Sequence, residues 1–334
     1  MITATALSRD FIRYKHKSGL KGALSNLFSR EKEVIHAVKD VSFQIEDGEF
    51  VGYIGPNGAG KSTTIKMLCG ILVPTSGQVS VNGIDPSKSR VENAKHIGAV
   101  FGQRSQLWWD LPIADSYALF QKMYRVDDAE FNKRLAVIRE MLELDEFWDA
   151  PVRQLSLGQR MRGEFGAALL HEPQVLYLDE PTLGMDVLVK EQIKGFLKRI
   201  NQERKVSILL TTHDLKDVED LCSRVMLINK GALLFDGGLN DMRAQSTAKT
   251  CLNLTFESEC DPDLINELTP ALQQAGIDIE PITPWRIAAQ FHRKQYTPIQ
   301  VIERASKLGT LSDMSLVEPP IDAVVAESYR WGGC

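Results

Sequence analysis

The chain has 334 residues, 43% of them hydrophobic and 25% charged, and its formal net charge is −5. This length and composition are ordinary for a soluble globular protein with one large domain and one smaller domain. The sequence holds no apolar run of about 18 residues, which excludes a transmembrane helix, and its charge provides no overall attraction to nucleic acid.

The first notable segment lies near the amino terminus, at residues 13–32, and combines basic with apolar residues. Its apolar residues recur at helical spacing and are Leu20, Leu24, Leu27 and Phe28. Its basic residues include Arg13, Lys15, Lys17 and Lys21. The spacing predicts a short helix, which packs on the main domain in the favoured interpretation and lies on a membrane surface in the other. The role of the segment stays open.

Short apolar runs alternate with helical stretches from about residue 34 to residue 236, which is typical of an α/β fold with buried strands. The predicted strands are 41–45, 50–54, 99–101, 175–178 and 207–211. Between Trp108 and Leu170 helical spacing replaces the strand pattern, so we expect a helical subdomain at about 104–170. The turn-rich stretch 230–238 predicts a closing hairpin, followed by a polar helix and linker.

A boundary is expected near 245–250, which divides the chain into a large domain at 1–245 and a small domain at 250–330. In the small domain, apolar and polar residues predict strands at 251–256, 286–291 and 311–317. Helices are expected after Pro262, from Pro298 and after Pro320. The pattern is typical of a small α+β sandwich, and it contains no constellation of catalytic residues.

Residues 55–62, Gly-Pro-Asn-Gly-Ala-Gly-Lys-Ser, follow an apolar strand and precede a helix, which is the context of a phosphate-binding loop. Gly58 and Gly60 allow successive backbone N–H groups to face an anion. The start of the helix and Lys61 add positive charge, and Ser62 can bind Mg²⁺. The alternative is a glycine-rich turn with an exposed lysine, and the agreement of strand, loop and helix disfavours it.

Two acids, Asp179 and Glu180, end an apolar strand, where they would lie beside a nucleotide bound at the carboxyl end of the sheet. Asp179 is predicted to hold Mg²⁺ through water, and Glu180 to orient and polarise the attacking water. Taken alone, such a pair is equally typical of a solvated strand end. The phosphate-binding loop earlier in the chain favours the catalytic interpretation.

The segment Ser156-Leu-Gly-Gln159 opens a predicted helix, and serine followed by glutamine three places later is a capping box. An exposed helix amino end beside a glycine can also bind a terminal phosphate. The two interpretations are compatible.

These motifs, with Gln103 after the loop and His213 after the acids, occur in an order that resembles the ATP-binding subunit of an ABC transporter over residues 2–240. The resemblance implies an α/β P-loop NTPase of the ABC ATPase type with a helical subdomain, plus a small α+β carboxyl-terminal domain. It implies that Gln103 contacts Mg²⁺ or the attacking water, and that His213 contacts the γ-phosphate. It also implies that residues 183–186 link two ATP sites. From the residues alone, His213 is a buried polar residue after a strand and Asp186 is a helix N-cap.

The motifs and the resemblance together predict three groups of site residues. The catalytic group is Glu180, His213 and Gln103. The ligands of Mg²⁺ are Ser62, Gln103 and Asp179. The ATP-binding group is Phe11, Gly55, Pro56, Asn57, Gly58, Ala59, Gly60, Lys61, Ser62, Thr63, Ser156, Gly158, Gln159 and Asp186. Leu157 replaces a glycine that is common in the family, but Gly158 is kept, so activity should survive. Tyr14 is the alternative to Phe11 for stacking on adenine.

By the same resemblance, two copies of the chain, or one copy and a sibling ATPase, dock head to tail across two ATP molecules. Closing and opening of this dimer would drive an integral membrane permease. The pair Trp108–Trp109 falls where such subunits meet their permease, although core packing is an equal alternative. The carboxyl-terminal domain resembles that of ABC-2 exporters of the drug-resistance and sodium-extrusion types. We therefore expect ATP hydrolysis that powers export through a separate permease.

Two other functions fit the sequence less well. A soluble ABC ATPase that acts on ribosomes or nucleic acid typically has two cassettes or long coiled coils, whereas this chain shows one cassette and no sustained heptads. A non-catalytic regulatory module would lack Glu180 or His213. No nucleic-acid partner is expected. Five scattered cysteines and the absence of a leader are typical of a cytoplasmic protein, here peripheral on the membrane through its permease.

Overall fold

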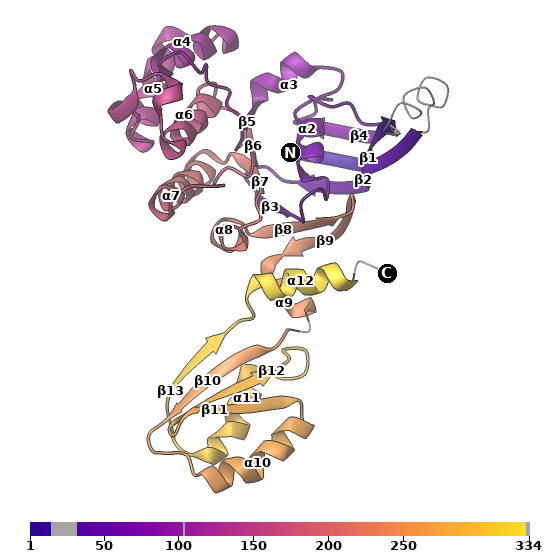
Figure 1. The fold of residues 1–334 in the computed structure, drawn as a ribbon, viewed down its shortest axis with the longest axis vertical. Helices are drawn as coiled ribbons and strands as arrows, with labels where there is room; N and C mark the ends of the chain where they lie inside the picture. The colour runs from indigo at the N-terminus through magenta and orange to yellow at the C-terminus, as the bar shows by residue number, and fades with distance from the viewer. Residues whose placement is uncertain (15–31, 103, 247, 332–334) are drawn as a thin grey trace, which may run out of the picture. The chain divides into compact units, whose positions relative to one another are not determined.

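The computed structural model describes residues 1–14, 32–102, 104–246 and 248–331 (Figure 1). Two compact units make up the chain, Met1–Gly237 and Gly238–Cys334. The unit boundary falls ahead of the predicted one at 245–250, because helix α9 (Leu239–Gln245) contacts α12 (Ile321–Trp331) of the second unit. The helix predicted from Leu20 to Phe28 and the candidate residue Gln103 lie outside the described residues.

A six-stranded sheet in the order β5-β6-β7-β3-β8-β9 is the centre of the first unit. Its strands are β3 (Phe50–Ile54), β5 (Ile97–Phe101), β6 (Val175–Asp179), β7 (Ser207–Thr211), β8 (Arg224–Asn229) and β9 (Ala232–Gly238). The pairs β5/β6, β6/β7, β3/β7 and β3/β8 are parallel. Every residue of β3 and β7 is buried, as expected for parallel strands that are covered on both faces. The parallel strands bring the ends of β3, β6 and β7 to one edge of the sheet.

A second sheet of the first unit is antiparallel and consists of β1 (Ile2–Tyr14), β2 (Lys32–Ile45) and β4 (Ser76–Val81), with β1 in the middle. The predicted strand 41–45 is the end of β2, whereas β1 and β4 were not predicted. The register between β1 and β2 shifts three times between Ala4 and Asp10. These irregularities interrupt the alternation of apolar and polar residues by which a strand is recognised in a sequence.

The helices of the first unit include α2 (Lys61–Leu68), α3 (Arg90–His96), α7 (Val187–Arg204) and α8 (Leu215–Leu221). The chain between β5 and β6 forms α4 (Ile113–Tyr124), α5 (Asp128–Met141) and α6 (Leu157–Leu169), with short 3₁₀ turns at Leu144–Phe147 and Val152–Gln154. Figure 1 shows α4, α5 and α6 grouped on the opposite side of the parallel sheet from β1, β2 and β4. A Cβ on Gly166 would lie 2.1 Å from the Tyr117 hydroxyl, so α4 and α6 approach closely through a glycine.

The second unit contains a four-stranded antiparallel sheet in the order β11-β12-β10-β13. Its elements after α9 are β10 (Thr250–Phe256), α10 (Pro262–Gln274), β11 (Ile277–Thr283), β12 (Arg286–Phe291), α11 (Pro298–Ala305), a 3₁₀ turn (Ser306–Leu308), β13 (Leu311–Val317) and α12. Buried residues alternate along β10, which packs with α10 and α11 around one core. The sequence predicted β10, β12 and β13 but missed β11. Among the described residues, no helix has the length and apolar character needed to cross a membrane.

Candidate nucleotide-binding site

The loop between β3 and α2 forms one wall of a pocket of about 880 Å³. Two of its glycines allow close backbone approach. A Cβ on Gly55 would lie 2.4 Å from the Ile228 carbonyl oxygen, and one on Gly60 would lie 2.5 Å from the Ala37 carbonyl oxygen. Gly60 also has a φ of 113°, which side chains rarely permit. The loop can therefore present its backbone N–H groups and the start of α2 to an anion.

The side chain of Lys61 is held inside this loop. The residue is 6% exposed, and its Nζ donates to the carbonyl oxygens of Gly55 at 2.6 Å and Pro56 at 3.2 Å. Burial lowers the pKa of Lys61, whereas the negative charges of Glu180 and Asp179 act in the opposite direction. Phosphate oxygens bound at the loop would favour the charged form further.

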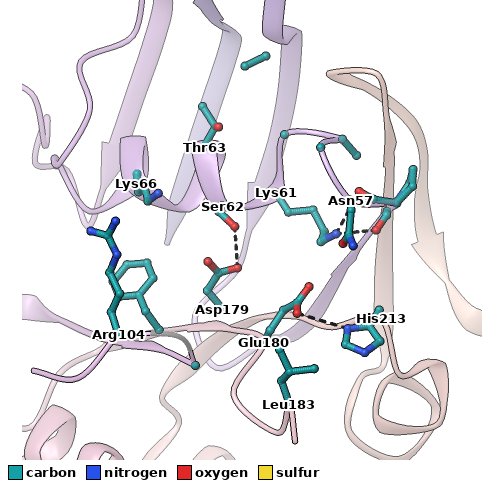
Figure 2. A pocket seen from close by; sticks show the side chains of 18 residues that line it. Asn57, Lys61, Ser62, Thr63, Lys66, Arg104, Asp179, Glu180, Leu183 and His213 are labelled. Atoms are coloured by element: carbon teal, nitrogen blue, oxygen red, sulfur yellow. Dashed lines mark hydrogen bonds and ion pairs between the residues drawn. The ribbon is translucent and has the colours of Figure 1, made fainter.

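Asp179 meets Ser62 at the carboxyl edge of the sheet. It lies beside Thr211 in the parallel register of β6 and β7. Ser62 Oγ donates to Asp179 Oδ1 at 3.0 Å (Figure 2). Thr211 Oγ1 donates to the same oxygen at 2.6 Å. Hydroxyl and carboxylate oxygens are the ligands that Mg²⁺ prefers, and Mg²⁺ is commonly bound by one or two such side chains together with phosphates. The residues at this position therefore fit the cation.

Glu180 and His213 lie next to each other across the pocket from Lys61 (Figure 2). The distance from His213 Nδ1 to Glu180 Oε2 is 3.4 Å. Glu180 has a φ of 52°, in the left-handed region, and its N–H donates to the carbonyl oxygen of Thr211 at 2.9 Å. The same N–H also lies 3.2 Å from Thr211 Oγ1. The backbone of β7 thus holds Glu180 in a sparsely populated conformation that aims its carboxylate into the pocket.

Several residues that line the pocket were missed by the sequence reasoning. They are Ala37, Lys66, Phe101, Gly102 and Arg104. Leu183, the first residue of the segment 183–186 expected to link two ATP sites, also lines the pocket. In Figure 2, Lys66 and Arg104 lie beyond the Ser62–Asp179 pair, on the side away from His213. The position of Lys66, four residues after Ser62 on the same helix, could have indicated its place in the wall. Arg104 is brought there by a tight turn after β5, in which its N–H donates to the Phe101 carbonyl oxygen.

Gly102 lies against the two acids of the site. Its N–H donates to the Asp179 carbonyl oxygen at 2.9 Å, and an added Cβ would lie 2.2 Å from the Glu180 carbonyl oxygen. The sequence indicates only that a glycine precedes the candidate residue Gln103. The fold shows which residues that glycine contacts. Gly102 therefore permits the turn after β5 to approach the backbone that carries Asp179 and Glu180.

We expect the substitution Gly102→Ala to reduce ATP turnover by roughly 100-fold, because the added methyl group would displace Glu180 by a fraction of an ångström or more. Steady-state phosphate release measures the effect, and thermal unfolding shows whether the fold persists. Gly195→Ala is the matched control, since a Cβ there meets no atom within 4 Å. Equal turnover in the two variants would contradict the proposed close contact.

Five of the predicted ATP-binding residues are not among those that line this pocket: Phe11, Ser156, Gly158, Gln159 and Asp186. Ser156 and Gln159 form the predicted capping box at the start of α6, and Asp186 caps α7 by accepting from the Val189 N–H at 3.0 Å. Phe11 is 36% exposed and stacks under the Arg9 guanidinium. The side chain of Tyr14 lies outside the described residues.

A buried carboxylate connects the turn after β5 to helix α6. Glu164 is 2% exposed and accepts from the Ser105 hydroxyl and from the Gln106 N–H at 3.0 Å. The Leu107 N–H contacts it at 3.4 Å. Burial raises the pKa of Glu164, while these hydrogen bonds act to lower it. The segment that follows the pocket residue Arg104 is thereby fixed to helix α6, whose N-cap is Ser156.

A buried parallel strand that runs into a glycine-rich loop and a helix, with acids at the end of a neighbouring strand, defines a P-loop NTPase. The ABC transporter family matches residues 38–183 of the chain. The chain is 31% identical to the ABC transporter ATP-binding protein NatA of Bacillus subtilis, over 70% of this chain and 95% of that protein. It belongs to the ATP-binding proteins of ABC transporters.

Two further comparisons extend this result. The linearmycin resistance ATP-binding protein LnrL of Bacillus subtilis is 31% identical over 85% of this chain and 91% of its own length. A solved structure of a dimeric ATP-binding cassette in a post-hydrolysis state, bound to ADP and Pi, superimposes with a TM-score of 0.60. It is 27% identical over 72% of this chain and 99% of that one. The chain is thus an ABC ATPase that binds and hydrolyses ATP, and ABC ATPases act as dimers with membrane permease subunits.

Proposed function

We propose that the chain powers the export of a substrate through a separate integral membrane permease. The observation that carries this proposal is the similarity to LnrL, which extends over 293 residues. The first unit ends at Gly237, so a match of this length includes part of the second unit as well. The shared architecture is therefore larger than the ATPase unit alone, and the relative that shares it is named for resistance to an antibiotic.

In the proposed mechanism, the phosphates of ATP occupy the loop 55–63, where backbone N–H groups and Lys61 compensate their charge. Ser62 and Asp179, with Gln103, would hold Mg²⁺, which when bound would supply positive charge beside the phosphates. Glu180 orients and polarises the attacking water, and His213 contacts the γ-phosphate. The pocket places Glu180 next to His213 and opposite Lys61, which supports these roles (Figure 2).

The remaining predicted residues would act in a dimer of two copies, or of this chain and a sibling ATPase. Ser156 and Gln159 form the capping box at the start of α6, and Gly158 lies in the first turn. The positive end of this helix dipole would face the γ-phosphate held by the other subunit. Residues 183–186, which end at Asp186, would link the two sites. Phe11 would stack on adenine. Closure on ATP and release after hydrolysis would then be transmitted to the permease.

The loop before α4 is the proposed contact with the permease. Trp109 is 53% exposed and Trp108 is 38% exposed, while the ring of Trp108 also packs on Phe120 at 5.3 Å between centroids. Thus Trp108 is partly exposed and partly packed in the core, which were the two alternatives considered from the sequence. Trp109 is the better candidate for contact with a partner protein. Exposed tryptophans are frequent anchors of protein interfaces. The contact would place the chain at the cytoplasmic face of the membrane.

The experiment that tests the proposal is affinity capture of the Glu180→Gln protein from detergent-solubilised cells in the presence of ATP. We expect stoichiometric recovery of a polytopic membrane protein, and loss of that protein when Trp109→Ala is added. Trp285→Ala, at a tryptophan of similar exposure in the second unit, is the matched control and should retain it. Recovery of ribosomal or DNA-associated partners without a membrane protein would instead favour the soluble ATPase alternative. Neither named relative supports that alternative.

A further inference from the structure

Glu180 has a left-handed backbone conformation, and the residues before and after it in space must hold it there. A non-glycine residue at this φ is costly, and it persists only where neighbouring contacts determine it. On the β7 side, Thr211 accepts from the Glu180 N–H. On the other side, the chain passes through Pro181 to Thr182, which is 4% exposed. The contacts of Thr182 are therefore one of the constraints on the backbone that carries the Glu180 carboxylate.

Thr182 is joined to the helix that follows His213. Its Oγ1 donates to Asp217 Oδ2 at 2.8 Å, and Asp217 on α8 is 2% exposed. Asp217 lies in the first turn of that helix, and its N–H donates to the Asp214 carbonyl oxygen. One buried hydrogen bond thus connects the segment after Glu180 with the element after His213, and the side chains of Glu180 and His213 are themselves 3.4 Å apart.

Helix α7 supplies the positive charge that this buried acid requires. Lys194 is 4% exposed, and its Nζ lies 3.7 Å from Asp217 Oδ1 and 2.7 Å from Asp220 Oδ2. Burial opposes the charged form of Lys194, but its hydrogen bonds with Asp220 and Glu191 raise its pKa overall. A buried carboxylate without such a partner would be strongly unfavourable. One carboxylate oxygen of Asp217 therefore faces Lys194, and the other accepts from Thr182.

We propose that Asp217 is a positioning residue for ATP hydrolysis, which acts by holding Thr182 and, through it, the carboxylate of Glu180 at the distance from His213 that catalysis needs. This inference rests on the proposed role of Glu180. Packing alone would be served by apolar residues of similar size, whereas a charged network gives one defined orientation. Small displacements of a catalytic group have large effects on rate, so the hydrogen bond acts on turnover more than on ATP binding.

The test compares Thr182→Val, which removes the hydroxyl but keeps the shape, with Thr182→Ser, which keeps the hydroxyl. We expect the valine variant to lose roughly 10- to 100-fold in single-turnover rate with unchanged ATP affinity, and the serine variant to restore most of that rate. Asp217→Asn should lower the rate in the same way and gives the answer if the valine variant does not fold. Val218→Ala, a fully buried neighbour on α8, reports the effect of destabilisation alone and should keep the rate.

A double variant separates positioning from a general structural role. If Thr182 acts through Glu180, then adding Thr182→Val to Glu180→Gln should reduce the residual rate little further. Additive losses, a normal rate in Thr182→Val, or an equal loss in Val218→Ala would overturn the proposal. A normal rate in Glu180→Gln alone would instead overturn the role of Glu180, which distinguishes the two failures.

Discussion

Replacement of Glu180 by glutamine is expected to lower ATP turnover by roughly 10²- to 10⁴-fold, the range that a positioned general base contributes. Glutamine keeps the size and the left-handed backbone position but cannot polarise the attacking water. Binding of ATP should be preserved, because the proposed phosphate contacts are those of the loop 55–63, including Lys61, on the opposite wall of the pocket. Steady-state phosphate release and equilibrium nucleotide binding measure the two effects separately.

Glu140→Gln is the control for this substitution, since it removes an equivalent charge from an exposed position on α5. It should leave turnover unchanged. A Glu180→Gln protein that hydrolyses ATP at the normal rate would contradict the assignment of Glu180 as the catalytic base. It would make His213 the next candidate for that role. Loss of ATP binding in the same variant would show that the change acts on the fold of the pocket and not on the chemical step.

The sequence predicted the parts of the site that are local in the chain. The loop 55–62 is contiguous, and its glycines, its lysine and the flanking strand and helix can all be recognised from adjacent residues. Asp179 and Glu180 were predicted for the same reason, since an apolar run leads directly into them. The capping box of Ser156 and Gln159 and the N-cap at Asp186 follow from spacing alone, and the structure confirms these hydrogen bonds.

The contacts that sequence reasoning missed join residues far apart in the chain. Gly102 meets Glu180 because β5 and β6 are neighbours, and Thr182 meets Asp217 because the loops after β6 and β7 are neighbours. No periodicity indicates such pairs before the strand order is known. Phe11 belongs to β1, and β1 was not predicted because its register shifts interrupt the alternating pattern of a strand. The pocket of one chain also does not include Ser156 or Gln159, which lie at the start of α6.

Substitution of Lys61 by alanine is expected to weaken ATP binding by roughly 10- to 100-fold, because a hydrogen bond from a charged donor contributes about 1.5–3 kcal/mol. Hydrolysis at subsaturating ATP should fall at least as far. The Nζ of Lys61 already lies at the loop, 2.6 Å from the Gly55 carbonyl oxygen, so little reorganisation is needed for it to reach the phosphates. Titration with a fluorescent ATP analogue measures the affinity, and thermal unfolding verifies the fold.

Lys66→Ala is the control for Lys61→Ala. It shows whether ATP affinity depends on the position of the positive charge or only on its presence in the pocket. Lys66 lies on the same helix and lines the same pocket, but Figure 2 places it beyond the Ser62–Asp179 pair, away from the loop. If the pocket attracted ATP only through its overall charge, the two alanine variants would lose similar affinity, and both losses would shrink at high salt. If Lys61 binds the phosphates directly, its loss should be much the larger and should persist in salt. Unchanged affinity in Lys61→Ala would contradict the phosphate-loop assignment.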